Sequence, residues 1–327
     1  MRLLVTGGAG FIGSHFVRSL LTGAYGPQPD VAVTVLDAFT YAGNRANLDP
    51  VRDDERLAVV AGDVADEAAV GAVLPGHDVV VNFAAESHVD RSIAGPAAFV
   101  RTNVLGAQVL LEAARESGVR RFLQVSTDEV YGSIGQGSWT EDTPLAPSSP
   151  YSASKAAADL VALAYARTFD MDVVVTRGSN TYGPYQYPEK LVPLFVTNLL
   201  DGLPVPLYGD GEHRRDWLHV DDHCRGIQLA LTAGRPGRVY HVGGGTELSN
   251  RQLTDRLLDI MGAPADLVVP AEDRRAHDRR YSLDISRSEA ELGYQPRVSF
   301  DDGLAAVVAW YRENRFWWEP LKAPAAP

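Results

Sequence analysis

The chain has little cysteine and little positive charge, and it contains no long apolar run. Cys224 is the only cysteine among 327 residues, so no disulfide forms within the chain and a four-cysteine metal site is excluded. The formal net charge is -12, which argues against a nucleic-acid or anionic-membrane partner, because phosphate backbones are bound by basic faces. There is no hydrophobic signal core and no run of about 18 apolar residues. We therefore expect no membrane partner and a cytoplasmic location.

A glycine-rich segment follows the first expected strand. Arg2 to Thr6 is a short apolar run, and Gly7-Gly8-Ala9-Gly10-Phe11-Ile12-Gly13 leads from it into the helical pattern of residues 11–21. Glycines at positions 7, 10 and 13 allow a tight turn, close approach of the backbone to a pyrophosphate, and close packing of the helix. The N-terminus of that helix supplies N–H donors and a positive dipole. This segment predicts a dinucleotide-binding loop.

An acidic residue ends the second expected strand, which covers residues 31–36. Asp37 stands at roughly the distance where a carboxylate binds the hydroxyls of an adenosine ribose, and a carboxylate there repels a 2'-phosphate. The predicted cofactor is therefore NAD rather than NADP. Asp63 and Val64 follow the third strand, residues 57–61, and are expected to meet the adenine edge.

Strand and helix patterns alternate up to about residue 177, which predicts an α/β fold with a doubly wound parallel sheet of the Rossmann type. The elements beyond it are shorter and rich in Pro, Gly, Tyr and basic residues. We therefore predict an NAD-binding domain over residues 1–177 and a smaller substrate-binding lid over 178–327. The boundary is expected to be interleaved, because a strand and a helix from about 212–248 return to the main sheet.

Acidic side chains follow the expected strand of residues 121–126. Thr127, Asp128 and Glu129 should emerge at its carboxyl end, where open α/β sheets bind ligands. Two carboxyls that share a site push each other's pKa values apart, so one can act as an acid while the other acts as a base.

A tyrosine and a lysine lie four residues apart in the expected helix 150–169. Tyr151 and Lys155 then share one helix face. An ammonium held near a phenol favours the phenolate, so Lys155 is expected to bring the pKa of Tyr151 toward neutrality and make it a base.

Together these motifs resemble the extended short-chain dehydrogenase/reductase family, and within it the dTDP-glucose 4,6-dehydratases. The glycine loop and Tyr151-x-x-x-Lys155 are typical of the broad family. The dehydratases are indicated by Ala84-Ala85-Glu86-Ser87-His88-Val89-Asp90-Arg91-Ser92 and Thr127-Asp128-Glu129, with further similarity at 179–186, 188–190, 214–217 and 273–278. The resemblance covers essentially the whole chain. Thr181 and Ala276 depart from it, since the family usually has Asn and Gly there.

The resemblance implies an NAD-dependent hydro-lyase that converts dTDP-glucose to dTDP-4-keto-6-deoxyglucose and water. In such an enzyme Tyr151 takes the proton of the sugar C4 hydroxyl, Glu129 removes the C5 proton, and a protonated Asp128 gives its proton to the leaving C6 hydroxyl. Thr127 hydrogen-bonds the C4 oxygen, and Lys155 also holds the nicotinamide ribose.

The resemblance further implies two sets of binding residues. The cofactor set is Gly7, Gly10, Phe11, Ile12, Gly13, Asp37, Thr40, Asp63, Val64, Phe83, Ala84, Ala85, Ser87, Thr102, Tyr151, Lys155 and Thr181. The substrate set is Ser87, Thr127, Asn180, Glu189, Lys190, Pro206, Tyr208, Arg215, Asn250, Arg274 and His277. Within it, Lys190, Arg215 and Arg274 are expected around the pyrophosphate, because cations pair with phosphate oxygens, and Tyr208 is expected to stack on the base. No metal site is expected, since no histidine has a close partner at metal spacing.

Different activities are compatible with part of this pattern. A nucleotide-sugar 4-epimerase shares the fold, NAD, Tyr151 and Lys155, but it needs no acid and base at C5 and C6. A decarboxylase of nucleotide-sugar acids, a non-catalytic NAD-sensing scaffold, and an enzyme that performs the same dehydration on UDP-glucose also remain open. A homodimer through the helices expected at 96–116 and 150–169 is also predicted.

Overall fold

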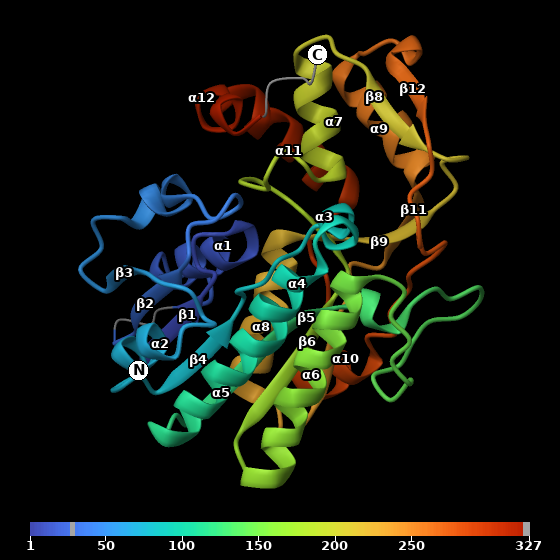
Figure 1. The fold of residues 1–327 in the computed structure, drawn as a ribbon. Helices are drawn as coiled ribbons and strands as arrows, with labels where there is room; N and C mark the ends of the chain where they lie inside the picture. Colours follow the sequence, from blue (N-terminus) through green and yellow to red (C-terminus); the bar gives the residue numbers. More distant parts are fainter. Residues whose placement is uncertain (27–29, 323–327) are drawn as a thin grey trace.

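The computed structural model describes residues 1–26 and 30–322 (Figure 1). Its centre is a seven-stranded sheet with the order β10-β6-β5-β4-β1-β2-β3, in which every neighbouring pair is parallel. The strands are β1 (Arg2–Thr6), β2 (Ala32–Asp37), β3 (Leu57–Ala61), β4 (Val79–Asn82), β5 (Arg121–Thr127), β6 (Val173–Gly178) and β10 (Val239–Val242). The predicted doubly wound parallel sheet is confirmed. The strand order reverses between β1 and β4, and ligands bind at such a switch point beyond the carboxyl ends of the strands.

The strands read as nearly continuous apolar runs because both faces of the sheet are covered. Along β1, Leu3 and Val5 belong to the core on one face, whereas Leu4 between them belongs to the core on the other. This alternation follows from the two-residue period of a strand.

Helices cover each face of this sheet (Figure 1). One core contains side chains from α1 (Phe11–Leu21), α8 (Val220–Ala233) and α10 (Ser286–Leu292). The other contains side chains from α2 (Glu67–Val73), α5 (Gly106–Glu116) and α6 (Pro150–Phe169). None of the helices in the described part of the chain combines the length and apolar character that a membrane crossing requires.

The single helix expected over residues 96–116 is divided into three consecutive segments. These are α4 (Pro96–Phe99), a π-helical segment η2 (Val100–Leu105), and α5. They follow the short α3 (Val89–Ala94). Single π-helical turns are common at functional sites, and η2 carries Thr102, which lines the cavity described below.

A third core lies beyond the carboxyl edge of the main sheet. It is formed by side chains that include those of α7 (Leu191–Leu200), α9 (Asn250–Met261), α11 (Phe300–Glu313) and α12 (Arg315–Trp318). Two small sheets accompany them, with the orders β11-β9-β7 and β12-β8. Their strands are β7 (Asn180–Tyr182), β8 (Val205–Tyr208), β9 (Arg214–His219), β11 (Thr246–Ser249) and β12 (Val268–Ala271). We propose that this region is the substrate lid. In contrast, β10 is a strand of the main sheet, and α8 packs on one face of that sheet.

Candidate active site

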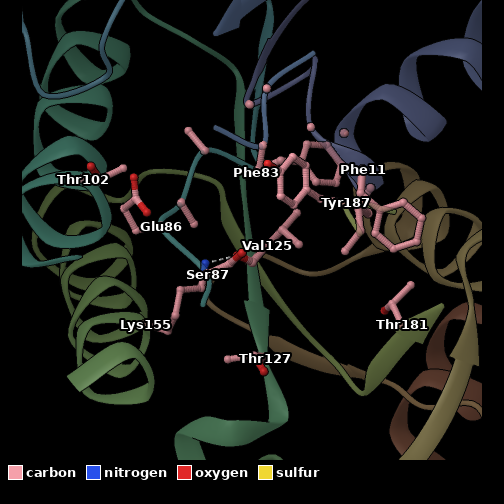
Figure 2. A pocket seen from close by; sticks show the side chains of 18 of the residues that line it. Phe11, Phe83, Glu86, Ser87, Thr102, Val125, Thr127, Lys155, Thr181 and Tyr187 are labelled. Carbon is pink, nitrogen blue, oxygen red and sulfur yellow. Dashed lines mark hydrogen bonds between the residues drawn. The ribbon is translucent and has the colours of Figure 1, made fainter. Parts of the chain in front are cut away.

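A cavity of about 350 Å³ opens at the carboxyl edge of the main sheet (Figure 2). Its walls come from the ends of β1, β2, β4, β5 and β6 and from the segment after β7. Every residue that the sequence analysis assigned to the cofactor lines this cavity. Among the substrate residues, Ser87, Thr127, Asn180, Glu189 and Lys190 line it as well. The structure thus brings together the motifs that are widely separated along the chain.

The glycine loop leaves space for a ligand at one end of the cavity. Gly7 has a φ of +66°, which L-residues with side chains rarely adopt. A Cβ added to Gly13 would lie 2.3 Å from the carbonyl oxygen of Gly7, so the helix can pack on the loop only without one. A Cβ on Gly10 would meet nothing closer than 3.3 Å, and it would instead fill the space that a ligand needs. Gly10 is also the N-cap of α1 and has no side-chain cap, which leaves first-turn N–H groups for a phosphate.

Asp37 braces the glycine loop from the end of β2. Its two carboxylate oxygens accept hydrogen bonds from the backbone N–H groups of Ala9 and Phe39, each at 2.9 Å. Burial raises the pKa of this carboxyl, and the two backbone donors act against that rise. Asp37 therefore fixes the loop and also lines the cavity where an adenosine ribose is expected.

The catalytic candidates meet at the end of β5. Thr127 is the last residue of the strand, and Asp128 and Glu129 begin the short helix η3 (Asp128–Tyr131). The backbone N–H of Glu129 donates to the hydroxyl of Thr127, which caps this turn. Tyr151 enters the same cavity from the first turn of α6.

The start of α6 is fixed by its sequence. Ser149 and Ser152 form a reciprocal capping box, and Pro150 occupies the first turn, where its missing N–H costs nothing. One turn beyond Tyr151, the ammonium of Lys155 donates to the carbonyl oxygen of Val125 on β5 at 2.7 Å (Figure 2). This bond ties the helix to the strand that carries the acids.

The expectation that Lys155 lowers the pKa of Tyr151 is wrong for this structure. Burial raises the pKa of Tyr151 well above its usual value, and the charges of Glu129 and Asp128 raise it further. Burial also lowers the pKa of Lys155 to about 8, with Asp159 acting against the shift. The reason is local, since the ammonium is directed at the Val125 carbonyl and two carboxyls lie near the phenol. Without its ligands, Tyr151 stays protonated at neutral pH.

The two carboxyls have different environments. Burial raises the pKa of Asp128 well above its usual value, and the charges of Glu129 and Asp216 add to the rise. Burial also raises the pKa of Glu129, but the cations Arg215 and Lys190 oppose it. The pKa of Asp128 is the more strongly raised, which favours the protonated form of Asp128 over that of Glu129.

A smaller cavity of about 70 Å³ adjoins the main one, because Glu129 and Asn180 line both. It is lined by three further substrate candidates, Arg215, Arg274 and His277. Arg215 donates to the carbonyl oxygen of Asp278 at 2.9 Å, and Arg274 pairs with Asp90 at 2.9 Å. The predicted basic cluster therefore lies next to the acid pair.

Three predicted substrate residues line neither cavity: Pro206, Tyr208 and Asn250. The ring of Tyr208 lies edge-on to that of His277, with centroids 6.4 Å apart, and the Arg274 guanidinium is 5.4 Å from its centre. Asn250 is buried at the start of α9, and its Oδ1 has no hydrogen-bond partner among the described residues. Of the three, Tyr208 therefore contacts two residues that line the smaller cavity.

The expectation that no histidine has a close ligand partner is also wrong. His213, Asp273 and His277 bring ligand atoms within 4.8 Å of one another. The sequence concealed this because His213 is far from the other two along the chain. The two imidazole rings are stacked 3.6 Å apart at 12°. The lone pairs of stacked rings lie in two parallel planes, so the rings must tilt before both reach one ion at about 2.0–2.1 Å.

Some cavity residues were missed in the sequence analysis. Three of them lie inside or beside motifs that carried the resemblance: Glu86, Gln186 and Tyr187. Their place in those motifs could have identified them as cavity residues. His223 also lines the cavity, from the first turn of α8, where a helical pattern gives no sign of it.

Buried polar atoms along the cavity lack partners within the described chain. They include Ser126 Oγ, Asn180 Oδ1, Gln186 Oε1 and Glu189 Oε1. Such atoms are costly to leave unpaired, so the cavity is suited to a ligand that offers hydrogen bonds along its whole length. A dinucleotide and a nucleotide sugar have that character.

Comparisons with known proteins agree with this geometry. The family model described as GDP-mannose 4,6 dehydratase matches residues 4–307. A dTDP-glucose 4,6-dehydratase of Streptomyces antibioticus is 60% identical over 332 residues, covering 100% of this chain and 98% of its own length. One of Streptomyces niveus is 58% identical over 324 residues, covering 99% of this chain and 96% of its own.

A solved structure is similar throughout. The dTDP-glucose 4,6-dehydratase of Streptomyces venezuelae, crystallised with NAD and TYD bound, is 64% identical with a TM-score of 0.97, and the match covers 98% of this chain and 100% of that one. The chain therefore belongs to the GDP-mannose 4,6 dehydratase family of extended short-chain dehydrogenases/reductases, in which the dTDP-glucose 4,6-dehydratases are its relatives.

Proposed function

We propose that this protein is an NAD-dependent dTDP-glucose 4,6-dehydratase, which converts dTDP-glucose to dTDP-4-keto-6-deoxyglucose and water. The observation that carries the proposal is the pair Asp128 and Glu129 at the end of β5, in the same cavity as Tyr151 and Lys155. A 4-epimerase needs the last two groups but not an acid and a base at C5 and C6. The two named dTDP-glucose 4,6-dehydratases, which are 60% and 58% identical to this chain over 98% and 96% of their own lengths, support the same activity.

NAD fits the main cavity. The glycine loop would hold the pyrophosphate, Asp37 the adenosine ribose, and Asp63 and Val64 the adenine. Lys155, which stays mainly charged at neutral pH with a pKa of about 8, would hold the nicotinamide ribose. When bound, NAD supplies a positively charged acceptor that takes the hydrogen from sugar C4 with its electron pair and later gives it to C6.

Tyr151 is the proposed base for the C4 hydroxyl. The phenol must first release its own proton. The phenolate oxygen then takes the proton of the C4 hydroxyl, and the hydrogen bond with Thr127 favours this deprotonated form. The positive charge that bound NAD supplies would also favour the deprotonated phenol and oppose the rise in pKa that burial causes. Oxidation at C4 makes the neighbouring C5 proton acidic, which is the condition for losing water.

The acid pair then removes water across C5 and C6. Glu129 takes the C5 proton, because Arg215 and Lys190 favour its ionised form. Asp128 gives its proton to the C6 hydroxyl, because burial and the charge of Glu129 keep it protonated. As the pH rises through the elevated pKa of Asp128 the donor loses its proton, so elimination is expected to slow on the alkaline side.

The cations near Glu129 are the proposed pyrophosphate site. Arg215, Arg274 and Lys190 lie along the passage between the two cavities. The Lys190 ammonium already donates to the carbonyl oxygen of Ser87 at 2.7 Å, so part of the site is in place before substrate binds. We place the base beside Tyr208 and His277, whose rings lie edge-on to each other. The proposed location of the enzyme is the cytoplasm, since its one cysteine is free and buried.

We also propose a homodimer. The segments η2 and α6 expose large apolar side chains, with exposed fractions of 55% for Val100, 42% for Leu105 and 58% for Leu160. Exposed apolar groups gathered on neighbouring helices are typical of an interface. The helices expected to form the dimer are the ones that carry these side chains.

The direct test of the activity is to incubate the purified chain with dTDP-glucose or UDP-glucose. We expect dTDP-glucose to yield a product that is lighter by one water, identified by mass spectrometry. The two bases differ by one methyl group, so kcat/KM should favour dTDP-glucose by about 10- to 200-fold. Loss of water from UDP-glucose at an equal or higher kcat/KM would contradict the assigned substrate, and recovery of a sugar epimer would contradict the reaction.

Substitutions of Tyr151 and Glu129 should separate oxidation at C4 from the loss of water. Tyr151→Phe should lower kcat by about 10²- to 10⁴-fold because it removes the C4 base. Glu129→Gln should still allow a change in the near-ultraviolet absorbance of the bound cofactor in a single turnover, while water loss stops. Tyr165→Phe is the matched control, since that phenol lies on α6 but bonds Glu112 outside the cavity. Native water loss by the Glu129 variant would show that another group is the C5 base.

The dimer is tested by light scattering at micromolar concentration. The native chain should have twice the monomer mass of 35.4 kDa. Leu160→Glu buries a charge at the proposed interface and should raise the dimer Kd by roughly tenfold or more. Leu203→Glu alters a leucine that is 42% exposed elsewhere, and it should leave the dimer intact. A native monomer, or a Leu160→Glu dimer of unchanged stability, would refute the interface.

A further inference from the structure

His223 has one ring nitrogen that is buried, unpaired and close to the reacting end of the main cavity. Its side chain is 2% exposed, and Nε2 has no hydrogen-bond partner among the described residues. A Cβ added to Gly178 would lie 2.5 Å from Nε2, so the absence of a side chain there gives the ring its place. Both residues line the cavity.

The hydrogen bonds of the other ring nitrogen fix the tautomer. The Thr181 hydroxyl donates to the carbonyl oxygen of Ser179 at 3.1 Å, which uses its only proton. The same hydroxyl lies 2.8 Å from His223 Nδ1. With that proton directed at Ser179, we assign the ring proton to Nδ1, which donates to Thr181 and leaves Nε2 as a bare acceptor. Burial also lowers the pKa of His223 to about 3, so the ring remains neutral at working pH.

The position of Gly178 shows which part of the cofactor this acceptor meets. In the sheet, Gly178 of β6 is the register partner of Thr127 of β5. Adjacent strands are about 4.8 Å apart, so His223 lies at the end of the cavity that holds the catalytic side chains. The adenosine end, at Asp37 and Asp63, is formed by β2 and the segment after β3. The half of NAD next to His223 is the nicotinamide half.

We propose that His223 Nε2 accepts a hydrogen bond from the carboxamide NH₂ of the nicotinamide, while Nδ1–H holds Thr181. The proposal rests on the proposed function in taking NAD as the bound group. The carboxamide is the one N–H donor at that end of the cofactor, and Nε2 needs a donor. His223 is thereby a positioning residue that limits rotation of the nicotinamide ring, and Thr181 acts through it.

The test is an equilibrium competition between NAD and its 3-acetylpyridine analogue, in which a methyl group replaces the carboxamide NH₂. The full chain is dialysed against both nucleotides, and the bound ratio is measured by mass spectrometry. We expect the preference for NAD to fall about three- to tenfold in His223→Asn, whose amide replaces Nδ1 but not Nε2. In His223→Gln, whose amide oxygen reaches the Nε2 position, the preference should be largely kept.

An unchanged preference in His223→Asn would overturn the proposal, since a merely structural role weakens the binding of both nucleotides equally. If neither nucleotide binds the native chain, the proposed function fails instead, so the two failures are distinguishable. A second measurement needs no variant: nitrogen NMR of the native chain with labelled histidine. An unprotonated Nε2 resonance should shift when NAD replaces the analogue, and identical spectra would contradict the contact.

Discussion

The proposed catalytic site depends on the burial of four ionisable groups, two that follow β5 and two on α6. Asp128, Glu129, Tyr151 and Lys155 lie where the low dielectric disfavours every charged form. Without ligands the pKa values of the phenol and of Asp128 are therefore both well above their usual values. The pKa values of the two carboxyls differ because their neighbouring charges differ, with cations beside Glu129 and carboxyls beside Asp128. Small rearrangements of charge on binding can then move protons, which is what an elimination by an acid and a base requires.

The surrounding fold holds the elements that carry these groups in fixed relative positions. The guanidinium of Arg177 on β6 donates to Asp159 of α6 at 2.9 Å, and both side chains are almost fully buried. The same guanidinium donates to the hydroxyl of Tyr131 at the end of η3 at 2.6 Å. Helix α6, strand β6 and the turn after β5 are thereby held together. Breaking such a pair leaves an uncompensated buried charge, which typically costs about 3–5 kcal/mol.

Much of the fold could be predicted from the sequence, for identifiable reasons. The apolar runs of β1 and β3 and the pattern of α1 have the predicted bounds, because each is bordered by glycine, charge or a loop. That the residues assigned to the cofactor line one cavity was predictable, because glycine spacing and strand-end acids are local signals. The π-helical segment η2 was not, since its side-chain pattern continues that of an α-helix.

The electrostatics could not be predicted in the same way. Spacing places Tyr151 and Lys155 on one helix face, but only the packing of α6 on β5 directs the ammonium to the carbonyl of Val125. The stacking of His213 on His277 and the free Nε2 of His223 depend on contacts between segments distant in sequence. Tertiary packing decides which groups become hydrogen-bond or stacking partners inside a buried site, and the periodicity of the sequence does not reveal them.

Tyr151, Asp128 and Glu129 are proposed to act together, so that hydrogen moves from C4 to C6 of one sugar while water is removed. The most informative measurement uses a glucosyl ring that carries deuterium at C4, with the product analysed by proton NMR and mass spectrometry. We expect deuterium in the product methyl group and, in heavy water, solvent deuterium at C5. Deuterium that remains at C4 would contradict dehydration, and deuterium released to solvent would contradict a transfer kept within one active site.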